Sequence, residues 1–451
     1  MDCNKWLKRV VVTLLMGAMF HALLAFVVFA DMPQTEDGPS YRAQALHMLD
    51  GSQSFFFFPP GTAIAALPFY AVLGNSLATD HLVATAFWIA FSVACAWLAW
   101  LVCDSKKAAW IATLLAAALP HGLLATTTIS SQPLTAALLA SSISLGVLSF
   151  RRKSLSLWTV MSALLAFAVL VRPAILALSV TVVLFLTWAA WKKQITGISA
   201  VRAVLVLCLM HAIFMLPVMH HNANQAQGFT VSTNNEWNLL VGNNPYTPNY
   251  KTGHFGQRSF DKLDADARQY LARFLPHHQP ADATFSERQN MRKEAIEYIM
   301  DHPMQFLYRV SNRFRGFWGM DYTASREVQN AYGTGRVPTA VMLLLEGGGF
   351  LMVLLSALLY LAVTGLDARN RLIYILLGAS IAPYLAAFSV AKYHTVVLPI
   401  LFPLAAQGIM WITSKEWSSS ELTVMSNKLL IMLLIVFLIQ IEHVYHIVEN
   451  H

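Results

Sequence analysis

The sequence predicts an all-α integral membrane protein with about eleven transmembrane helices, and three observations support this fold class. First, 56% of the 451 residues are hydrophobic and only 12% are charged, which is too apolar for a soluble domain of this size. Second, the apolar residues gather in runs long enough to cross about 30 Å of hydrocarbon. Third, the basic residues gather in alternate gaps between these runs. The formal net charge of +7 therefore reflects membrane topology, and we expect a lipid bilayer rather than nucleic acid as partner.

The apolar runs divide the chain into three regions. Residues 1–219 are expected to form an N-terminal transmembrane module, 220–337 a large loop, and 338–451 the C-terminal transmembrane helices. The first run could also be a signal peptide cleaved after Ala30, although Val28 breaks the usual small-residue pattern. The predicted spans lie at about 10–30, 80–102, 107–126, 131–149, 155–171, 173–191, 199–219, 338–364, 370–388, 394–413 and 427–447.

Lysine and arginine determine the predicted orientation, because cytoplasmic loops are enriched in them. With the N-terminus inside, fifteen of these residues lie at the inner ends of the spans and three in short outer segments. We therefore predict an N-in, C-out protein of the plasma (inner) membrane whose loops at 31–79 and 220–337 are extracytoplasmic, or periplasmic. The outer three are Arg42, Arg172 and Lys392, and the inner fifteen are Lys5, Lys8, Arg9, Lys106, Lys107, Arg151, Arg152, Lys153, Lys192, Lys193, Arg202, Arg369, Arg371, Lys415 and Lys428.

The first outer loop, residues 31–79, contains two predicted juxtamembrane helices. Asp37 precedes a short amphipathic helix that ends at Gly51. After a Pro-Pro-Gly turn at 59–61, an apolar helix ends at Gly74 and is too short to cross a bilayer, so we expect it to lie in the interface. The acidic candidates for chemistry in this loop are Asp31, Glu36, Asp37 and Asp50.

The large loop contains two predicted helices in succession. Ser286 and Gln289 form a capping-box pattern that begins the first, and Pro303 begins the second. In the second helix Arg309 and Arg313 share one face, and aromatic and aliphatic residues share another. This pattern is typical of a basic amphipathic helix that lies on a membrane surface and binds lipid headgroups.

Ionisable residues are scarce inside the predicted spans. No Asp or Glu occurs from 105 to 235, so carboxylate-driven transport through the early spans lacks a carrier. Glu346 is a carboxylate well inside a late span, which makes it a functional candidate without an assigned role. We predict no metal site, because the histidine pair at 220–221 has no carboxylate or cysteine at ligand spacing.

Five short motifs lie on the predicted outer face. They are Asp37-Gly38-Pro39-Ser40-Tyr41, Phe58-Pro59-Pro60-Gly61, Arg172-Pro173, the segment 238–243, and Lys392-Tyr393-His394. Together they resemble motifs of GT-C glycosyltransferases of the protein-mannosyltransferase and aminoarabinose-transferase type. The resemblance implies an enzyme that transfers a sugar from a polyprenyl-phosphate donor to an unidentified acceptor, with no cofactor.

The resemblance also implies roles for individual residues. Asp37 would be the catalytic residue, and the substrate would be bound by Tyr41, Arg172, Lys392, Tyr393 and His394. Displacing a sugar from a lipid phosphate needs a base for the acceptor's proton and cations for the leaving phosphate, and a single displacement inverts the anomeric carbon. Gln132 stands where the family often has a second acid, which puts a two-acid mechanism in doubt. A divalent metal is compatible with these residues but not required by them.

Other interpretations stay open at this stage. Asp37 could serve only as a helix N-cap, and Arg172 and Lys392 could be cations whose head groups reach the interface from helix ends. A transporter or flippase of a lipid-linked substrate would share the basic outer residues, but it would also show polar residues and broken helices inside the membrane. A non-catalytic scaffold would use the large loop to bind a partner protein.

Overall fold

The computed structural model describes residues 2–249, 263–275, 280–333, 339–364, 368–414, 430, 433–438 and 440. Every regular element within these residues is a helix, which confirms the all-α class. Eight of the described helical segments are long and apolar enough to cross a bilayer, as expected of an integral membrane protein.

Each of the first ten predicted spans forms a helix. Two of these are shorter apolar helices, α8 (Leu155–Val171) and α17 (Ala368–Ala386, apolar from Arg371), and the eleventh predicted span lies largely outside the described residues. The span count of eleven therefore stays a prediction. The other helices at the predicted spans are α1 (Asp2–Leu23), α4 (Leu77–Val102), α5 (Lys106–Ala117) with α6 (Pro120–Leu124), α7 (Ser131–Arg152), α9 (Leu176–Trp191), α10 (Gly197–Asn224), α16 (Thr339–Thr364) and α18 (Leu398–Ser414).

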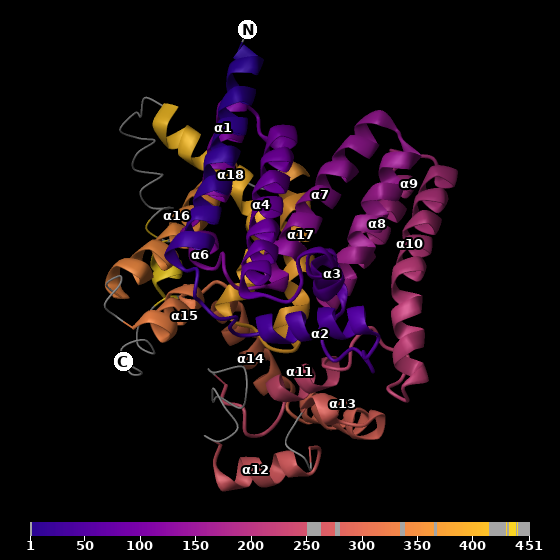
Figure 1. The fold of residues 1–451 in the computed structure, drawn as a ribbon. Helices are drawn as coiled ribbons and strands as arrows, with labels where there is room; N and C mark the ends of the chain where they lie inside the picture. Colours follow the sequence, from indigo (N-terminus) through magenta and orange to yellow (C-terminus); the bar gives the residue numbers. More distant parts are fainter. Residues whose placement is uncertain are drawn as a thin grey trace.

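The predicted outer segments gather at one end of the helix bundle. Figure 1 shows the N-terminus at one end and the helices of both loops at the other. This arrangement agrees with the prediction that the two loops share a side of the membrane, but which side faces the cytoplasm stays a prediction. The loop helices are α2 (Gly38–Asp50), α3 (Gly61–Leu73), α11 (Asn235–Gly242), α12 (Ala265–Ala272), α13 (Phe285–Asp301), α14 (Pro303–Phe317) and α15 (Thr323–Tyr332).

The early and late spans share one apolar core. The late helix α18 packs on α16 and also on α5, α4 and α7, although up to about 300 residues of sequence separate them. Small residues make this close packing feasible, because α5 turns four buried alanines toward its neighbours. These four are Ala108, Ala109, Ala112 and Ala116. The early spans and the described late helices, α16 and α18, are thus far apart in sequence but pack against each other in space.

A buried carboxylate fastens the juxtamembrane helices to the bundle. Asp80 of α4 is fully buried and accepts hydrogen bonds from Arg42 of α2 at 2.9 Å and from Tyr70 of α3 at 2.6 Å. A buried charge is tolerated only when it is paired and hydrogen-bonded. The three side chains therefore hold α2 and α3 against α4 and position the first loop.

The first predicted helix of the large loop begins earlier than its sequence pattern suggested. Its N-cap is Thr284, whose side chain accepts from the backbone of Glu287 while Glu287 reaches back to the Thr284 backbone. This is a complete capping box, so the predicted pair Ser286 and Gln289 lies inside α13 instead. The next helix, α14, begins at Pro303 as predicted.

The prediction of a surface-lying basic helix is wrong for α14. Arg309 and Arg313 are both 0% exposed, whereas Met304 and Leu307 of the same helix are exposed. The physical reason is that helix C-termini leave carbonyl groups without partners. Arg313 donates to the carbonyl groups of Leu385 and Ala386 at the end of α17, and also to the carbonyl of Gly242 at the end of α11. One guanidinium thus caps two helices, where the negative ends of their dipoles favour a cation.

We expect Arg313→Met to loosen the attachment of the large loop to α17. The change leaves buried carbonyl oxygens without donors, and each such loss costs about 1–3 kcal/mol, so the free energy of unfolding should fall by at least about 3 kcal/mol. Thermal unfolding in detergent, together with tryptic cleavage of the loop, measures the effect. Arg292→Met is the matched control, because Arg292 is exposed on neighbouring α13. Equal stability of the two variants would contradict the capping role.

Candidate functional site

Asp37 has a carboxylate group without a partner. The residue stands at the N-cap of α2, but its side chain makes no capping hydrogen bond. It also forms no hydrogen bond or ion pair with any other described residue, although it is half-buried. Two other acids of the loop are engaged, since Asp31 accepts from Tyr332 at 2.6 Å and Asp50 accepts from Ser52 at 2.9 Å. The N-cap interpretation therefore does not account for the Asp37 side chain.

Glu36 holds the basic residue of the late motif. Its carboxylate pairs with Lys392 Nζ at 2.9 Å and with Arg326 at 3.3 Å. Glu36 adopts a φ of 51°, which is uncommon for a residue other than glycine. Asp37 is near enough to act electrostatically on Lys392 and on Tyr41. Lys392 therefore has one paired carboxylate and one unpaired carboxylate beside it.

Arg172 lies at the centre of an aromatic and hydroxyl cluster. It joins the end of α8 to a 3-10 turn, Pro173–Ile175, that precedes α9. Its guanidinium donates to Ser131 Oγ and to Tyr384 Oη, both at 3.0 Å, and lies 4.6 Å from the ring centre of Tyr393. These contacts use a planar guanidinium, which lysine cannot reproduce.

Tyr41 adds a neutral donor next to this cluster. Its side chain is 4% exposed and packs edge-on against Phe58, and its hydroxyl interacts with that of Ser131. Burial raises the pKa of Tyr41, and the charge of Asp37 raises it further, so the phenol keeps its proton. The structure thus brings together Asp37, Tyr41, Arg172, Lys392 and Tyr393.

His394 is the predicted site residue that lies elsewhere. It belongs to a 3-10 helix, Ala391–Val397, in which successive side chains point about 120° apart. Lys392 therefore faces Glu36, Tyr393 faces Arg172, and His394 points into the interior, where it is 2% exposed and stacks on Phe350 at 3.6 Å. The three residues are adjacent in the sequence, but the backbone directs their side chains to different surroundings.

Close backbone packing fixes the position of Arg172. Gly61 begins α3, and a Cβ atom there would lie 2.5 Å from the backbone nitrogen of Val171, the residue before Arg172. Only glycine permits this approach. The Pro-Pro-Gly turn of the first loop therefore sets where α8 ends.

A cavity of about 40 Å³ opens beside Lys392, which is room for a few water molecules. Glu36, Gln132 and His121 also line it. Gln132, which stands where a second acid was anticipated, is 5% exposed and lies at the first turn of α7. The neutral amide at this place supplies hydrogen bonds but no negative charge.

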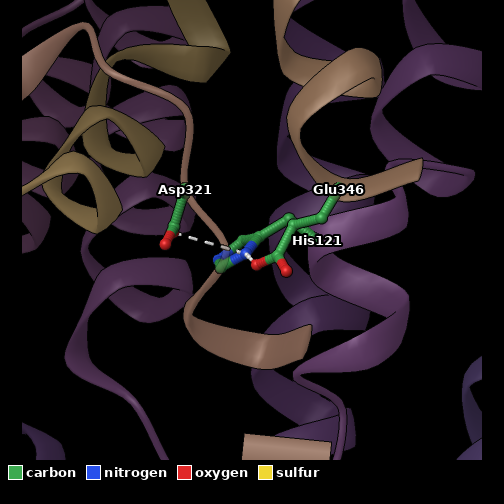
Figure 2. Close-up of side chains that lie close together, drawn as sticks. All are labelled: His121, Asp321 and Glu346. Carbon is green, nitrogen blue, oxygen red and sulfur yellow. Dashed lines mark hydrogen bonds and ion pairs between the residues drawn. The ribbon is translucent and has the colours of Figure 1, made fainter. Parts of the chain in front are cut away.

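His121, which lines this cavity, also belongs to a cluster of ionisable side chains with Asp321 and Glu346 (Figure 2). His121 Nδ1 lies 2.8 Å from Glu346 Oε1 and 3.4 Å from Asp321 Oδ2. Burial raises the pKa of Asp321, but the charges of His121 and His394 outweigh this effect and hold it below its ordinary value. The sequence pointed to Glu346 alone, because its partners are 225 and 25 residues away along the chain and no local pattern connects them.

We expect Gly61→Ala to destabilise the protein by about 1–3 kcal/mol, because the added methyl group must push the end of α8 and with it Arg172. Thermal unfolding in detergent measures the change. Gly197→Ala is the matched control, since Gly197 also begins a helix but a Cβ there meets nothing within 4 Å. If the Gly61 variant is as stable as the control, the helices α3 and α8 can move apart at little cost and their contact does not fix Arg172.

No family model matches this chain, and no curated protein sequence matches it significantly. Solved structures do match. The oligosaccharyltransferase AglB from Archaeoglobus fulgidus, in complex with an inhibitory peptide and a dolichol-phosphate, covers 95% of this chain at a TM-score of 0.45 and 11% identity. This chain spans about half of AglB, 54% of its length. ArnT from Cupriavidus metallidurans bound to undecaprenyl phosphate covers 89% of this chain, which spans 78% of ArnT, at a TM-score of 0.40 and 14% identity. These structural neighbours are polytopic glycosyltransferases of the GT-C superfamily, whose motifs the sequence resembles.

Proposed function

We propose that this protein is an inverting glycosyltransferase that moves a sugar from a polyprenyl-phosphate-linked donor to an extracytoplasmic acceptor. The observation that carries the proposal is the unpartnered carboxylate of Asp37 beside Lys392, with Arg172 close to the same tyrosine, Tyr393, on which both of these charges act. An unpaired carboxylate in a half-buried position can accept a proton from an acceptor group. Cations fixed in the same place can stabilise the phosphate that leaves.

The proposed reaction is a single displacement. Asp37 takes the proton of the acceptor's hydroxyl or amine while that group bonds to the anomeric carbon of the sugar. The bond between this carbon and the phosphate oxygen breaks, and the electron pair stays on the lipid phosphate. Arg172 binds that phosphate through its planar donors and Lys392 binds it as a point charge. Attack from the side opposite the leaving group inverts the anomeric carbon.

The ion pair of Glu36 and Lys392 is compatible with this reaction as the arrangement of the site before the donor binds. When a phosphate binds Lys392, Glu36 keeps Arg326 as a partner, at 3.3 Å. The exchange therefore leaves Glu36 paired, whereas a Glu36 carboxylate without a partner would oppose phosphate binding. The remaining polar groups, Tyr41 and Tyr393, then lie where they can contact the sugar or the phosphate.

The proposal includes the topology derived from the basic residues. The protein would cross the plasma (inner) membrane eleven times, N-in and C-out, with the reaction on the periplasmic face. The lipid tail would lie between spans, and the acceptor would approach from the aqueous side past the large loop, residues 220–337. The base and the cations are all side chains of this protein, so a divalent metal is compatible with the displacement without being required for it.

We expect Asp37→Asn to trap the donor. The amide cannot take a proton, but the phosphate-binding cations remain, so the variant should bind the donor without consuming it. Native mass spectrometry of the detergent-purified variant should therefore show a bound polyprenyl-phosphate sugar. Wild type should carry either no lipid or only the lipid phosphate that is left after the sugar has been transferred. Asp50→Asn is the matched control, because Asp50 is an exposed carboxylate of the same loop. If the variant and wild type carry the same lipids and neither retains a lipid-linked sugar, the transporter or scaffold interpretation replaces this one.

We expect Arg172→Lys and Lys392→Met each to weaken binding of undecaprenyl phosphate by about 10- to 100-fold, the loss of one charge-assisted hydrogen bond. Lipid titration by native mass spectrometry measures the affinity, with size-exclusion profiles to establish that each variant is folded. Lys293→Met, which removes an exposed lysine of α13, should bind the lipid as wild type does. If Arg172→Lys binds the lipid as tightly as wild type does, the planar guanidinium group of Arg172 has no role in binding the phosphate.

A further inference from the structure

We propose that His121, Asp321 and Glu346 bind one divalent transition-metal ion, at a site separate from Asp37. The three side chains come from α6, from the connection between α14 and α15, and from α16. One ligand atom from each lies within 4.8 Å of the others. The residues are 9%, 3% and 1% exposed, respectively. Figure 2 shows all three turned toward a common point.

One oxygen atom of this cluster has no hydrogen bond. Asp321 Oδ1 accepts from the backbone nitrogen of Thr323 at 3.0 Å, but Asp321 Oδ2 is buried and has no hydrogen-bond partner among the described residues, and His121 Nδ1 of the same cluster lies 3.4 Å from it. His121 directs its Nδ1 to Glu346 at the shorter distance. Buried polar atoms are nearly always satisfied, so an orphan carboxylate oxygen aimed into the cluster indicates a missing partner.

The charge of the cluster indicates that the missing partner is a cation. Two buried carboxylates carry more negative charge than the one imidazole beside them can neutralise, which is costly. A divalent ion that replaces the His121 proton gives two carboxylates, a neutral imidazole and a net charge of zero. A second proton, on neighbouring His394, would also balance the charge, and it is the competing arrangement that the experiment must exclude.

The surroundings of Glu346 suit a metal ligand. Its Oε1 accepts from the backbone of Ala324 at 3.1 Å, and its Oε2 accepts from the backbone and hydroxyl of Ser325 at 2.9 and 2.6 Å. These contacts with the first turn of α15 fix the carboxylate and still leave a lone pair of Oε1 for an ion once the His121 proton is gone. Such outer contacts commonly orient metal ligands.

The ligand set points to Zn²⁺ or Mn²⁺. One imidazole nitrogen and two carboxylate oxygens suit these ions, whereas Mg²⁺ prefers six oxygen ligands and retains its waters. His121 also lines the cavity beside Lys392, so water in that cavity can complete the coordination. The ion would join three segments that are distant in sequence, next to the cavity that His121 lines.

Metal analysis of the folded protein tests the proposal. Purified wild type is stripped with a chelator, dialysed against Zn²⁺ or Mn²⁺ and analysed by inductively coupled plasma mass spectrometry. We expect about one ion per chain, as for other sites with three protein ligands, and no displacement by excess Mg²⁺. For Asp321→Asn we expect at least about 100-fold weaker binding, because the amide keeps the acceptor for Thr323 but loses the ligand oxygen. Wild type that binds neither ion overturns the proposal.

Two further measurements locate the ion. Glu36→Gln changes a carboxylate that lines the same cavity but lies outside the cluster, and it should keep the ion. Equal metal content in wild type and Asp321→Asn, or loss in Glu36→Gln, overturns the assignment. If Asp321→Asn does not fold, X-ray absorption at the zinc edge of wild type decides, since the site requires a single imidazole among oxygen ligands. The metal content does not depend on glycosyl transfer, so it can fail or succeed independently of the Asp37→Asn experiment.

Discussion

The guanidinium of Arg313 is the contact on which the geometry of the outer end depends. It lies fully buried between the last carbonyl groups of α11 and α17. The chain segment that carries Lys392 and Tyr393 follows directly after α17, so the position of this helix end determines where both side chains lie. Gly242 permits the approach, because a Cβ there would lie 1.8 Å from the carbonyl oxygen of Ala387. A single side chain of the large loop thereby fixes a segment that begins the last described span.

The sequence was sufficient for features that depend on local periodicity. Apolar runs predicted the positions of ten helices, because the bilayer imposes both the length and the composition of a span. The same reasoning failed for Arg309 and Arg313. Helical spacing shows which residues share a face, but it does not show what covers that face, and here helix C-termini more than 60 residues away along the chain supply the carbonyl acceptors.

In the candidate site, too, the sequence predicted contacts between neighbouring residues but not contacts between distant segments. Asp37 and Tyr41 are separated by one helical turn, so the sequence could place them together. The pairing of Glu36 with Lys392 spans 356 residues, and Asp321 gave no signal at all because its partners come from other segments. His394 points away from Lys392 and Tyr393 because adjacent side chains diverge in the 3-10 helix that this segment forms, and a short aromatic motif does not show which of its side chains faces the site.

Two charge clusters at this end of the bundle are balanced differently. Lys392 and Arg326 share the carboxylate of Glu36, and Arg326 also pairs with Glu327 at 3.0 Å, so these cations already have carboxylate partners before any ligand binds. The cluster of His121, Asp321 and Glu346 has a surplus of negative charge until a cation arrives. Lys392, His121 and Gln132 line one cavity, and the neutral Gln132 adds no charge to it. An additional carboxylate at that position would pair with Lys392 and compete with a phosphate for it.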